Sequence, residues 1–163
     1  MQLPDAEALC ADLARQLRAH VTPETGMVGI HTGGAWLAER LHRALALALP
    51  LGTLDISFYR DDYRTTGLHK SVRASRIPFD VGGRHLLLAD DVLYTGRTVR
   101  AAMNELFDYG RPESIRLVAL VDRGERELPI CPQFVGTALG VPGGSMLRLG
   151  RDAGGRLALR LDA

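Results

Sequence analysis

The sequence predicts an α/β fold in which helices flank a central parallel sheet. Three apolar runs with the character of buried strands, at 27–30, 85–89 and 114–122, alternate with two amphipathic helical patterns, at 35–49 and 95–110. This alternation favours parallel pairing, because each helix returns the chain to the edge of the sheet where the previous strand began.

The first half of the chain alternates helix and strand. Apolar side chains recur at helical spacing from about Pro4 to His20, and a turn rich in Thr, Pro and Gly ends this predicted helix. The turn His31–Gly34 separates the strand at 27–30 from the helix at 35–49. Residues 54–58 alternate between apolar and polar side chains, which is the period of a half-exposed strand.

The second half contains one long polar stretch and a glycine-rich tail. Residues Arg60 to Asp80 are too many for a passive connection in a compact domain, so we expect a lid or substrate loop there. After Gly136, glycine-rich turns separate short alternating runs, which we interpret as late edge strands.

Composition and charge exclude several classes of protein. No apolar stretch approaches the roughly 18 residues of a membrane span, and the first residues lack the basic-then-apolar order of a signal peptide, so we expect a cytoplasmic protein without a membrane partner. Cys10 and Cys131 form no CxxC pair and accompany no histidine cluster. With 46% hydrophobic residues we expect a single domain over residues 1–163, and a net charge of +1 leaves nucleic-acid binding to a local patch.

The most informative segment is LLLADDVLYTGRT, residues 86–98. In open parallel sheets, ligands bind beyond the carboxyl ends of the strands, and Asp90 and Asp91 fall at such an end. The turn Thr95–Thr98 then opens a helix, whose free N–H groups and positive dipole end suit a phosphate monoester. The two carboxylates suit a neighbouring polyol or a magnesium-bound group.

Phosphoribosyl diphosphate satisfies these requirements, because it has a phosphate, a vicinal diol and a metal-binding diphosphate. The alternative is structural: Asp90 and Asp91 only cap the strand, and Thr95 only caps the helix. Two other nucleotide-binding signatures are absent. The chain contains no GxG, and the nearest approach to a P-loop, Gly29–Gly34, continues with Ala35 where that motif needs lysine.

Residues 86–112, LLLADDVLYTGRTVRAAMNELFDYGRP, resemble the phosphoribosyl-diphosphate motif and following helix of type I phosphoribosyltransferases. The chain is most similar to the PyrR family, pyrimidine-operon attenuation regulators that also act as uracil phosphoribosyltransferases. Further matching stretches are VGIHTGGAWLAERL, GTLDISFYRDD, IPFDV and VALVDRGERELPI, and the resemblance covers about Met27 to Gly136. It implies a type I phosphoribosyltransferase fold with a small hood and a flexible lid loop.

The resemblance also assigns the site residues. The implied catalytic residues are Asp90, Asp91, Arg60 and Asp61. The ribose and 5′-phosphate are bound by Asp90, Asp91, Val92, Leu93, Tyr94, Thr95, Gly96, Arg97 and Thr98. The diphosphate turn is His31, Thr32, Gly33 and Gly34, and the base hood is Val121, Asp122 and Arg123. Mg²⁺ is expected to arrive with the substrate, near the two aspartates, without a direct protein ligand.

The diphosphate turn departs from the family pattern. Similar proteins have a Lys/Arg-Thr-Arg-Gly sequence there, whereas this chain has HTGG, so Gly33 removes a cation and His31 is only partly charged near neutrality. We therefore expect weakened catalysis, and we expect Gly33→Arg to raise it. Alternatively, Arg60, Arg64 or Lys70 reaches the same oxygens.

The residues expected to bind RNA depart further from the family. Family members have Thr-Arg-x-x-His on the first helix and a histidine in RGHREL, where this chain has Asp12 and Glu125 at the apparent equivalents. Carboxylates oppose a phosphate backbone, so we expect weak binding to operon leader RNA. Alternatively, other basic residues rebuild the patch: Arg15, Arg18, Arg123 and Arg126.

The first hypothesis for function is a Mg²⁺-dependent uracil phosphoribosyltransferase, which converts uracil and phosphoribosyl diphosphate to UMP and diphosphate. One alternative is a nucleotide-sensing regulator that binds pyrimidine-operon leader RNA and has weak catalysis. Another is a phosphoribosyltransferase for a purine or orotate, although VDRGERELPI resembles the uracil group. We expect a homo-oligomer, either a dimer or a tetramer.

Overall fold

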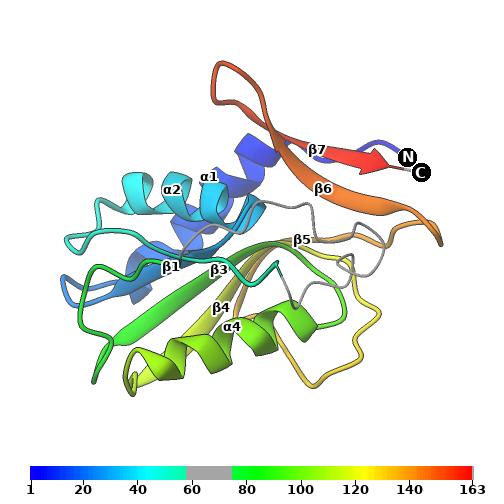
Figure 1. Ribbon diagram of the computed structural model, residues 1–163. Helices are drawn as coiled ribbons and strands as arrows, with labels where there is room; N and C mark the ends of the chain where they lie inside the picture. Colours follow the sequence, from blue (N-terminus) through cyan, green and yellow to red (C-terminus); the bar gives the residue numbers. More distant parts are fainter. Residues whose placement is uncertain (58–74, 163) are drawn as a thin grey trace.

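The structure is a computed structural model that describes residues 1–57 and 75–162. Within this part, five parallel strands form a sheet in the order β2-β1-β3-β4-β5, with α1 and α2 on one face and α4 on the other (Figure 1). The strands of this sheet are β1 (Gly26–Ile30), β2 (Gly52–Leu54), β3 (His85–Leu93), β4 (Ser114–Asp122) and β5 (Phe134–Ala138). The helices are α1 (Ala6–Leu17), the short 3₁₀ turn η1 (Arg18–His20), α2 (Gly33–Leu45) and α4 (Arg97–Asp108). The predicted α/β class is confirmed.

The helix boundaries follow from local capping. α1 begins after Asp5, whose Oδ1 accepts a hydrogen bond from the Glu7 N–H at 3.0 Å. α2 ends at Leu45, four residues before the predicted end at Leu49, because Ala46 adopts a left-handed conformation with φ 49°.

Strand register brings the acidic end of β3 to the edge of the sheet. On one side β3 pairs with β1, and the last pair of that ladder joins Gly29 to Ala89. On the other side the ladder with β4 continues as far as the pair of Leu93 and Asp122. Residues 90–93 therefore extend beyond β1 while β4 still supports them, so their side chains lie at the carboxyl edge of the sheet.

Both faces of β3 are buried, as expected for a central parallel strand. Leu87 and Ala89 pack into the core on the side of α1 and α2. Leu86 and Leu88 pack into the core on the side of α4. The apolar run that predicted this strand thus fills two separate cores, which fixes β3 rigidly beneath the aspartates.

The tail forms a feature that the sequence did not predict. Of the expected late edge strands, β5 does join the parallel sheet, but β6 (Met146–Arg151) and β7 (Leu157–Asp162) pair only with each other as an antiparallel hairpin. Leu147 and Leu149 anchor this hairpin in the core of α1 and α2. In Figure 1 the hairpin lies over the carboxyl edge of the sheet, and both chain termini lie at its end.

The region between β2 and β3 is only partly described. β2 spans Gly52–Leu54, so the strand predicted at 54–58 overlaps it only at Leu54; residues 55–57 are not in a strand, and Phe58 lies outside the described residues. Most of the predicted lid, Arg60 to Asp80, also lies outside them. In its described part, the backbone of Arg76 exchanges two 2.8 Å hydrogen bonds with Thr53. Within the described ranges, no helix has the length and apolar character needed to cross a membrane.

Candidate active site

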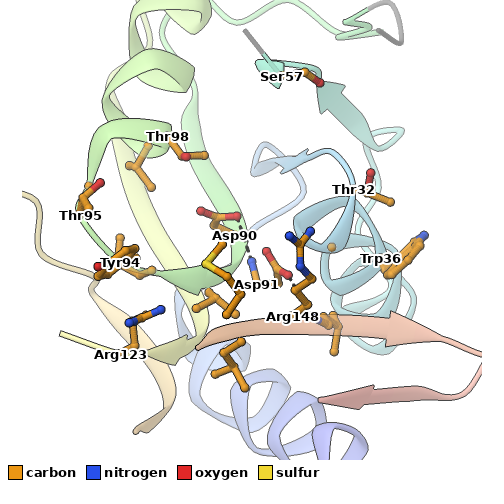
Figure 2. Close-up of a pocket in the computed structure, with 18 of the residues that line it drawn as sticks. Thr32, Trp36, Ser57, Asp90, Asp91, Tyr94, Thr95, Thr98, Arg123 and Arg148 are labelled. Carbon is orange, nitrogen blue, oxygen red and sulfur yellow. Dashed lines mark hydrogen bonds between the residues drawn. The ribbon is translucent and has the colours of Figure 1, made fainter. Parts of the chain in front are cut away.

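A cavity of about 520 Å³ opens at the carboxyl edge of the sheet. Figure 2 shows that its walls come from β3, the start of α4, the start of α2, the end of β4 and the hairpin. The described lining residues are Thr32, Gly33, Trp36, Asp55, Ser57, Asp90, Asp91, Val92, Leu93, Tyr94, Thr95, Gly96, Thr98, Val99, Arg123, Met146, Leu147, Arg148 and Leu149. The fold therefore brings most of the predicted motif, two residues of the turn and one residue of the hood to one cavity.

Asp90 and Asp91 form the acidic wall of this cavity. Their exposed fractions are only 2% and 7%, and both side chains point into the cavity in Figure 2. The Asp91 N–H donates to Asp90 Oδ1 at 3.1 Å, and the Leu149 N–H donates to Asp91 Oδ2 at 3.4 Å. Buried carboxylates need hydrogen-bond donors or cations, so this wall suits a polyol, a cation or both.

The turn that the resemblance assigns to the 5′-phosphate, which we call the phosphate-binding turn, is built around Gly96, whose φ of 93° is left-handed. A side chain there would also meet the segment between β4 and β5, residues 123–133, which we call the hood loop, because a Cβ would lie 2.9 Å from Ile130 Cγ1. The N-cap residue Gly96 has no side chain to cap α4, and within the first turn the Arg97 N–H donates to the Thr95 hydroxyl at 3.2 Å. The start of α4 therefore presents backbone donors to the cavity, together with the hydroxyls of Thr95 and Thr98.

The diphosphate turn packs closely on β3. The His31 N–H donates to Leu54 O at 2.8 Å, and a Cβ on Gly34 would lie 2.5 Å from Ala89 O. A Cβ on Gly33 would lie 2.2 Å from Asp91 Oδ2. The expectation that Gly33→Arg would improve the site stays a prediction, and the structure argues against it, because the new Cβ requires the Asp91 carboxylate to shift.

Of the four turn residues, Thr32 and Gly33 line the cavity, whereas His31 and Gly34 support the turn. Of the three predicted hood residues, only Arg123 lines it. Val121 is fully buried, and its strand β4 pairs with β5 at this point. The predicted catalytic residues Arg60 and Asp61 lie outside the described residues.

Asp122 has a structural partner rather than a position in the cavity. Both of its carboxylate oxygens accept hydrogen bonds from Arg126 Nη2, at 2.9 and 2.7 Å, and Oδ1 also accepts the Gly124 N–H at 3.0 Å. Burial raises the pKa of Asp122, but the hydrogen bonds from Arg126 and Gly124 and the charge of Arg126 outweigh this effect and hold the pKa below its usual value. Asp122 therefore stays ionised and fixes the hood loop.

Arg123 forms the wall opposite the acidic pair. Its guanidinium lies 3.8 Å above the Tyr94 ring, and its Nη1 donates to Ser145 O at 3.3 Å. Nη2 lies 3.6 Å from Glu125 Oε1, and the buried Nε has no hydrogen-bond partner. Glu125 also accepts a hydrogen bond from the Tyr94 hydroxyl, and this bond, burial and the charge of Glu125 raise the pKa of Tyr94.

Three hydrogen bonds join the hood loop to the carbonyl groups of the turn at Tyr94 and Thr95, one from a side chain and two from the backbone. Arg126 Nη1 donates to Tyr94 O at 2.8 Å. The N–H groups of Glu127 and Leu128 both donate to Thr95 O, at 2.9 and 3.1 Å. The loop that follows β4 and the turn that begins α4 are thus attached to one another.

Sequence reasoning missed several lining residues because they are distant in the chain. Trp36 lies on the first turns of α2, and the Ser57 N–H donates to Asp55 Oδ1 at 3.0 Å. Arg148 lies on β6, where Leu147 and Leu149 point into the core. The alternation of residues 146–151 showed that Arg148 is on the opposite face from these leucines, but it gave no indication that this face borders a cavity.

The parallel sheet, the acidic pair and the open helix start define a phosphoribosyltransferase. The model of the phosphoribosyl transferase domain family matches residues 2–137, and the chain belongs to this family. The hypoxanthine-guanine phosphoribosyltransferase of Bacillus anthracis has the same fold, with a TM-score of 0.68 and 20% identity over 88% of this chain and 85% of that chain. A hypoxanthine phosphoribosyltransferase of Staphylococcus aureus is also similar, with a TM-score of 0.65 and 23% identity over 86% of this chain and 76% of that chain.

Within this family the chain belongs to the PyrR proteins. It is 54% identical over 157 residues to the bifunctional protein PyrR of Pseudomonas paraeruginosa, which covers 93% of this chain and 87% of that protein. It is 49% identical over 164 residues to the bifunctional protein PyrR of Pseudomonas fluorescens, which covers 98% of each. The resemblance inferred from the motif, the type I fold and the phosphoribosyltransferase activity are therefore confirmed.

Proposed function

We propose that this chain transfers the phosphoribosyl group of phosphoribosyl diphosphate to uracil in a Mg²⁺-dependent reaction that yields UMP and diphosphate. The supporting observation is that the buried pair Asp90 and Asp91 shares one cavity with the start of α4, whose N-cap residue is a glycine. The first feature suits the ribose diol, and the second suits the 5′-phosphate. A sugar phosphate that carries both groups matches this arrangement.

In the proposed reaction, N1 of uracil forms a bond to the anomeric carbon while the bond from that carbon to the diphosphate oxygen breaks. The uracil N1 proton is released, and the electron pair leaves with the diphosphate. Positive charge develops on the sugar in the transition state, as in glycoside cleavage. The carboxylates of Asp90 and Asp91 stabilise that charge, and the N–H groups of α4 hold the 5′-phosphate in place.

The residues of the cavity fit a magnesium ion that arrives with the substrate. Asp90 and Asp91 offer the hard oxygen donors that Mg²⁺ prefers. Residues 1–57 and 75–162 contain no cluster of three or more His, Cys, Asp or Glu side chains that would hold a metal without the substrate. When bound, Mg²⁺ neutralises the diphosphate and makes it a better leaving group.

The preference for uracil rests on the PyrR relatives and on Arg123 of the hood, whose guanidinium stacks on the Tyr94 ring. Initial rates with uracil, hypoxanthine and orotate, each with and without Mg²⁺, test the proposal. We expect turnover with uracil and Mg²⁺ to exceed the other rates. Faster turnover with hypoxanthine or orotate would contradict the assignment of uracil as the base. No turnover with any of the three bases would contradict the proposed enzymatic activity.

A second function, binding of pyrimidine-operon leader RNA, is proposed because the PyrR relatives are named bifunctional. The expected affinity is weak. Asp12 engages Arg15 at 2.6 Å, and hydrogen bonds from Arg15 and Gln16 lower the pKa of Asp12, so its negative charge persists. A gel-shift with the cognate leader tests binding.

The homo-oligomer and the cytoplasmic location stay predictions. Sedimentation velocity tests the oligomeric state.

A further inference from the structure

The described lining of the cavity has more acidic side chains than basic ones. The described lining includes three carboxylates, from Asp55, Asp90 and Asp91, and two guanidinium groups, from Arg123 and Arg148. A sugar diphosphate carries several negative charges, so its binding needs cations near the diphosphate as well as at the 5′-phosphate. The position of each arginine decides which part of the ligand it can reach.

Arg123 belongs to the base end of the cavity. It follows β4 directly, stacks on Tyr94, and is held there by Ser145 and Glu125. Its side chain is almost wholly buried, with an exposed fraction of 7%. These contacts keep the guanidinium beside the hood, away from the turn of Thr32 and Gly33.

Arg148 belongs to the opposite end. Figure 2 shows its side chain extending from β6 into the cavity, on the side of Asp91, Thr32 and Trp36. β6 is fixed in this position by the hydrogen bond from the Leu149 N–H to Asp91 Oδ2. Arg148 is therefore the described lining cation next to the turn that the family resemblance assigns to the diphosphate.

The fold leaves Arg148 little freedom to point elsewhere. Its neighbours Leu147 and Leu149 are buried in the core of α1 and α2, so strand alternation directs Arg148 to the other face. Asp162 Oδ2 lies 3.2 Å from Arg148 Nε across the hairpin. This half-exposed ion pair orients the guanidinium, while the strand holds its Cα above the turn.

We propose that Arg148 binds the diphosphate of phosphoribosyl diphosphate and supplies there the positive charge that Gly33 does not. The inference rests on the proposed function and deepens it. UMP has no diphosphate, so Arg148 contributes to the binding of the substrate and of the diphosphate product but not to that of the nucleotide. It is thus a residue that distinguishes substrate from nucleotide product.

Calorimetric titration of Arg148→Gln tests the inference, with phosphoribosyl diphosphate plus Mg²⁺, inorganic diphosphate plus Mg²⁺, and UMP as three separate ligands. Loss of a charged hydrogen bond predicts that the first two bind about 10- to 100-fold more weakly, while UMP binds within about twofold of wild type. Arg148→Lys keeps the positive charge but not the planar guanidinium. Its affinities for phosphoribosyl diphosphate and diphosphate should therefore lie between those of wild type and those of Arg148→Gln.

Arg160→Gln is the matched control. Arg160 pairs directly opposite Arg148 in the hairpin and lies on the same face, but it does not line the cavity, so this variant removes the same charge from the same element. It should bind all three ligands like wild type. Thermal midpoints of both variants, measured in parallel, verify that the hairpin is folded.

The outcomes separate the inference from the proposed function. If wild type binds neither phosphoribosyl diphosphate nor UMP, the proposed function fails. If wild type binds both, and Arg148→Gln binds phosphoribosyl diphosphate as tightly as wild type, the function stands and the role of Arg148 is overturned. The role of Arg148 is also overturned if Arg148→Gln weakens the binding of UMP as much as that of phosphoribosyl diphosphate. The same holds if Arg160→Gln weakens binding as much as Arg148→Gln does. In both cases the arginine acts through the structure or through general charge.

Discussion

The Asp91 carboxylate occupies the space in which any residue larger than glycine at position 33 would place its Cβ. A Cβ on Gly33 would lie 2.2 Å from Asp91 Oδ2 and 2.4 Å from Asp91 Cγ. Asp91 is itself attached to the hairpin through Leu149, so the carboxylate cannot withdraw without loosening that contact. A side chain at position 33 therefore requires the Asp91 carboxylate to shift, so glycine at this position affects the acidic wall as well as the charge of the turn.

Gly33→Ala and Gly33→Arg should both reduce kcat/KM, by at least about tenfold, because each displaces Asp91 from its position at the sugar. Steady-state rates with uracil measure the effect. Gly140→Ala is the control, since a Cβ at Gly140 meets nothing within 4 Å. If Gly33→Arg were more active than wild type, the missing positive charge would be the main defect of the turn, and contact with Asp91 would not limit activity.

Asp90→Asn and Asp91→Asn should lower kcat by about 100- to 1,000-fold, because each removes charge that stabilises the cation-like sugar. Thermal midpoints should stay the same or rise, since two acidic side chains buried side by side are costly to the folded state. Rate and midpoint are measured on the same preparations. If the variants unfold while their folded fraction keeps full turnover, the aspartates have a structural role instead.

Thr95→Val and Thr98→Val should each weaken UMP binding by about 1–3 kcal/mol, the cost of losing one hydrogen bond to a charged phosphate. Uridine, which has no phosphate, should bind each variant as it binds wild type. Thr137→Val is a suitable control, because Thr137 lies on β5 away from the cavity. Unchanged UMP affinity in both test variants would show that the phosphate lies elsewhere.

The Asp122 and Arg126 pair should make stability depend on pH in the acid range. The folded-state pKa of Asp122 lies below its ordinary value of 3.8, so the pair stabilises the protein above that value and is lost as pH falls through the lower folded pKa. Wild type should therefore be more stable than Asp122→Asn at pH 7, and this difference should shrink below about pH 4. Denaturant unfolding of both proteins at pH 7, 5 and 3 measures it; a constant difference would argue against the ion pair as its source.

Asp12→Asn should strengthen binding to leader RNA, because it removes a negative charge and releases Arg15 from their 2.6 Å ion pair. The slope of log affinity against log salt should steepen by about 0.7–0.9 for each additional phosphate that the protein neutralises. Binding of both proteins across a salt series measures this. Wild-type affinity already in the nanomolar range with a steep slope, strengthened by UMP, would make regulation the principal function.

The sequence predicted the part of the site that is continuous in the chain. In residues 86–98 the strand, the carboxylates and the helix start follow one another directly, so strand periodicity and turn chemistry were sufficient to place them. Leu87 and Ala89 point to one core and Leu86 and Leu88 to the other, as a run buried on both faces requires.

The rest of the site depends on contacts between distant residues. The hydrogen bond between Asp91 and Leu149 joins positions 58 residues apart, and no local pattern indicates where such a hairpin docks. The partner of Asp122 was equally hidden, because Arg123 and Arg126 both follow it and only the left-handed turn at Gly124 and Glu125 directs Arg126 back to it.

The attachment of the hood loop to the phosphate-binding turn has a thermodynamic consequence. Tyr94 O and Thr95 O accept hydrogen bonds from Arg126, Glu127 and Leu128, so the two loops order as one unit. When a first ligand immobilises one loop, the other loop is immobilised with it, so a second ligand that binds there loses less conformational entropy. Free uracil and a bound ribose 5-phosphate moiety should therefore bind with positive cooperativity, and UMP, which joins them, should bind more tightly than its separate halves imply.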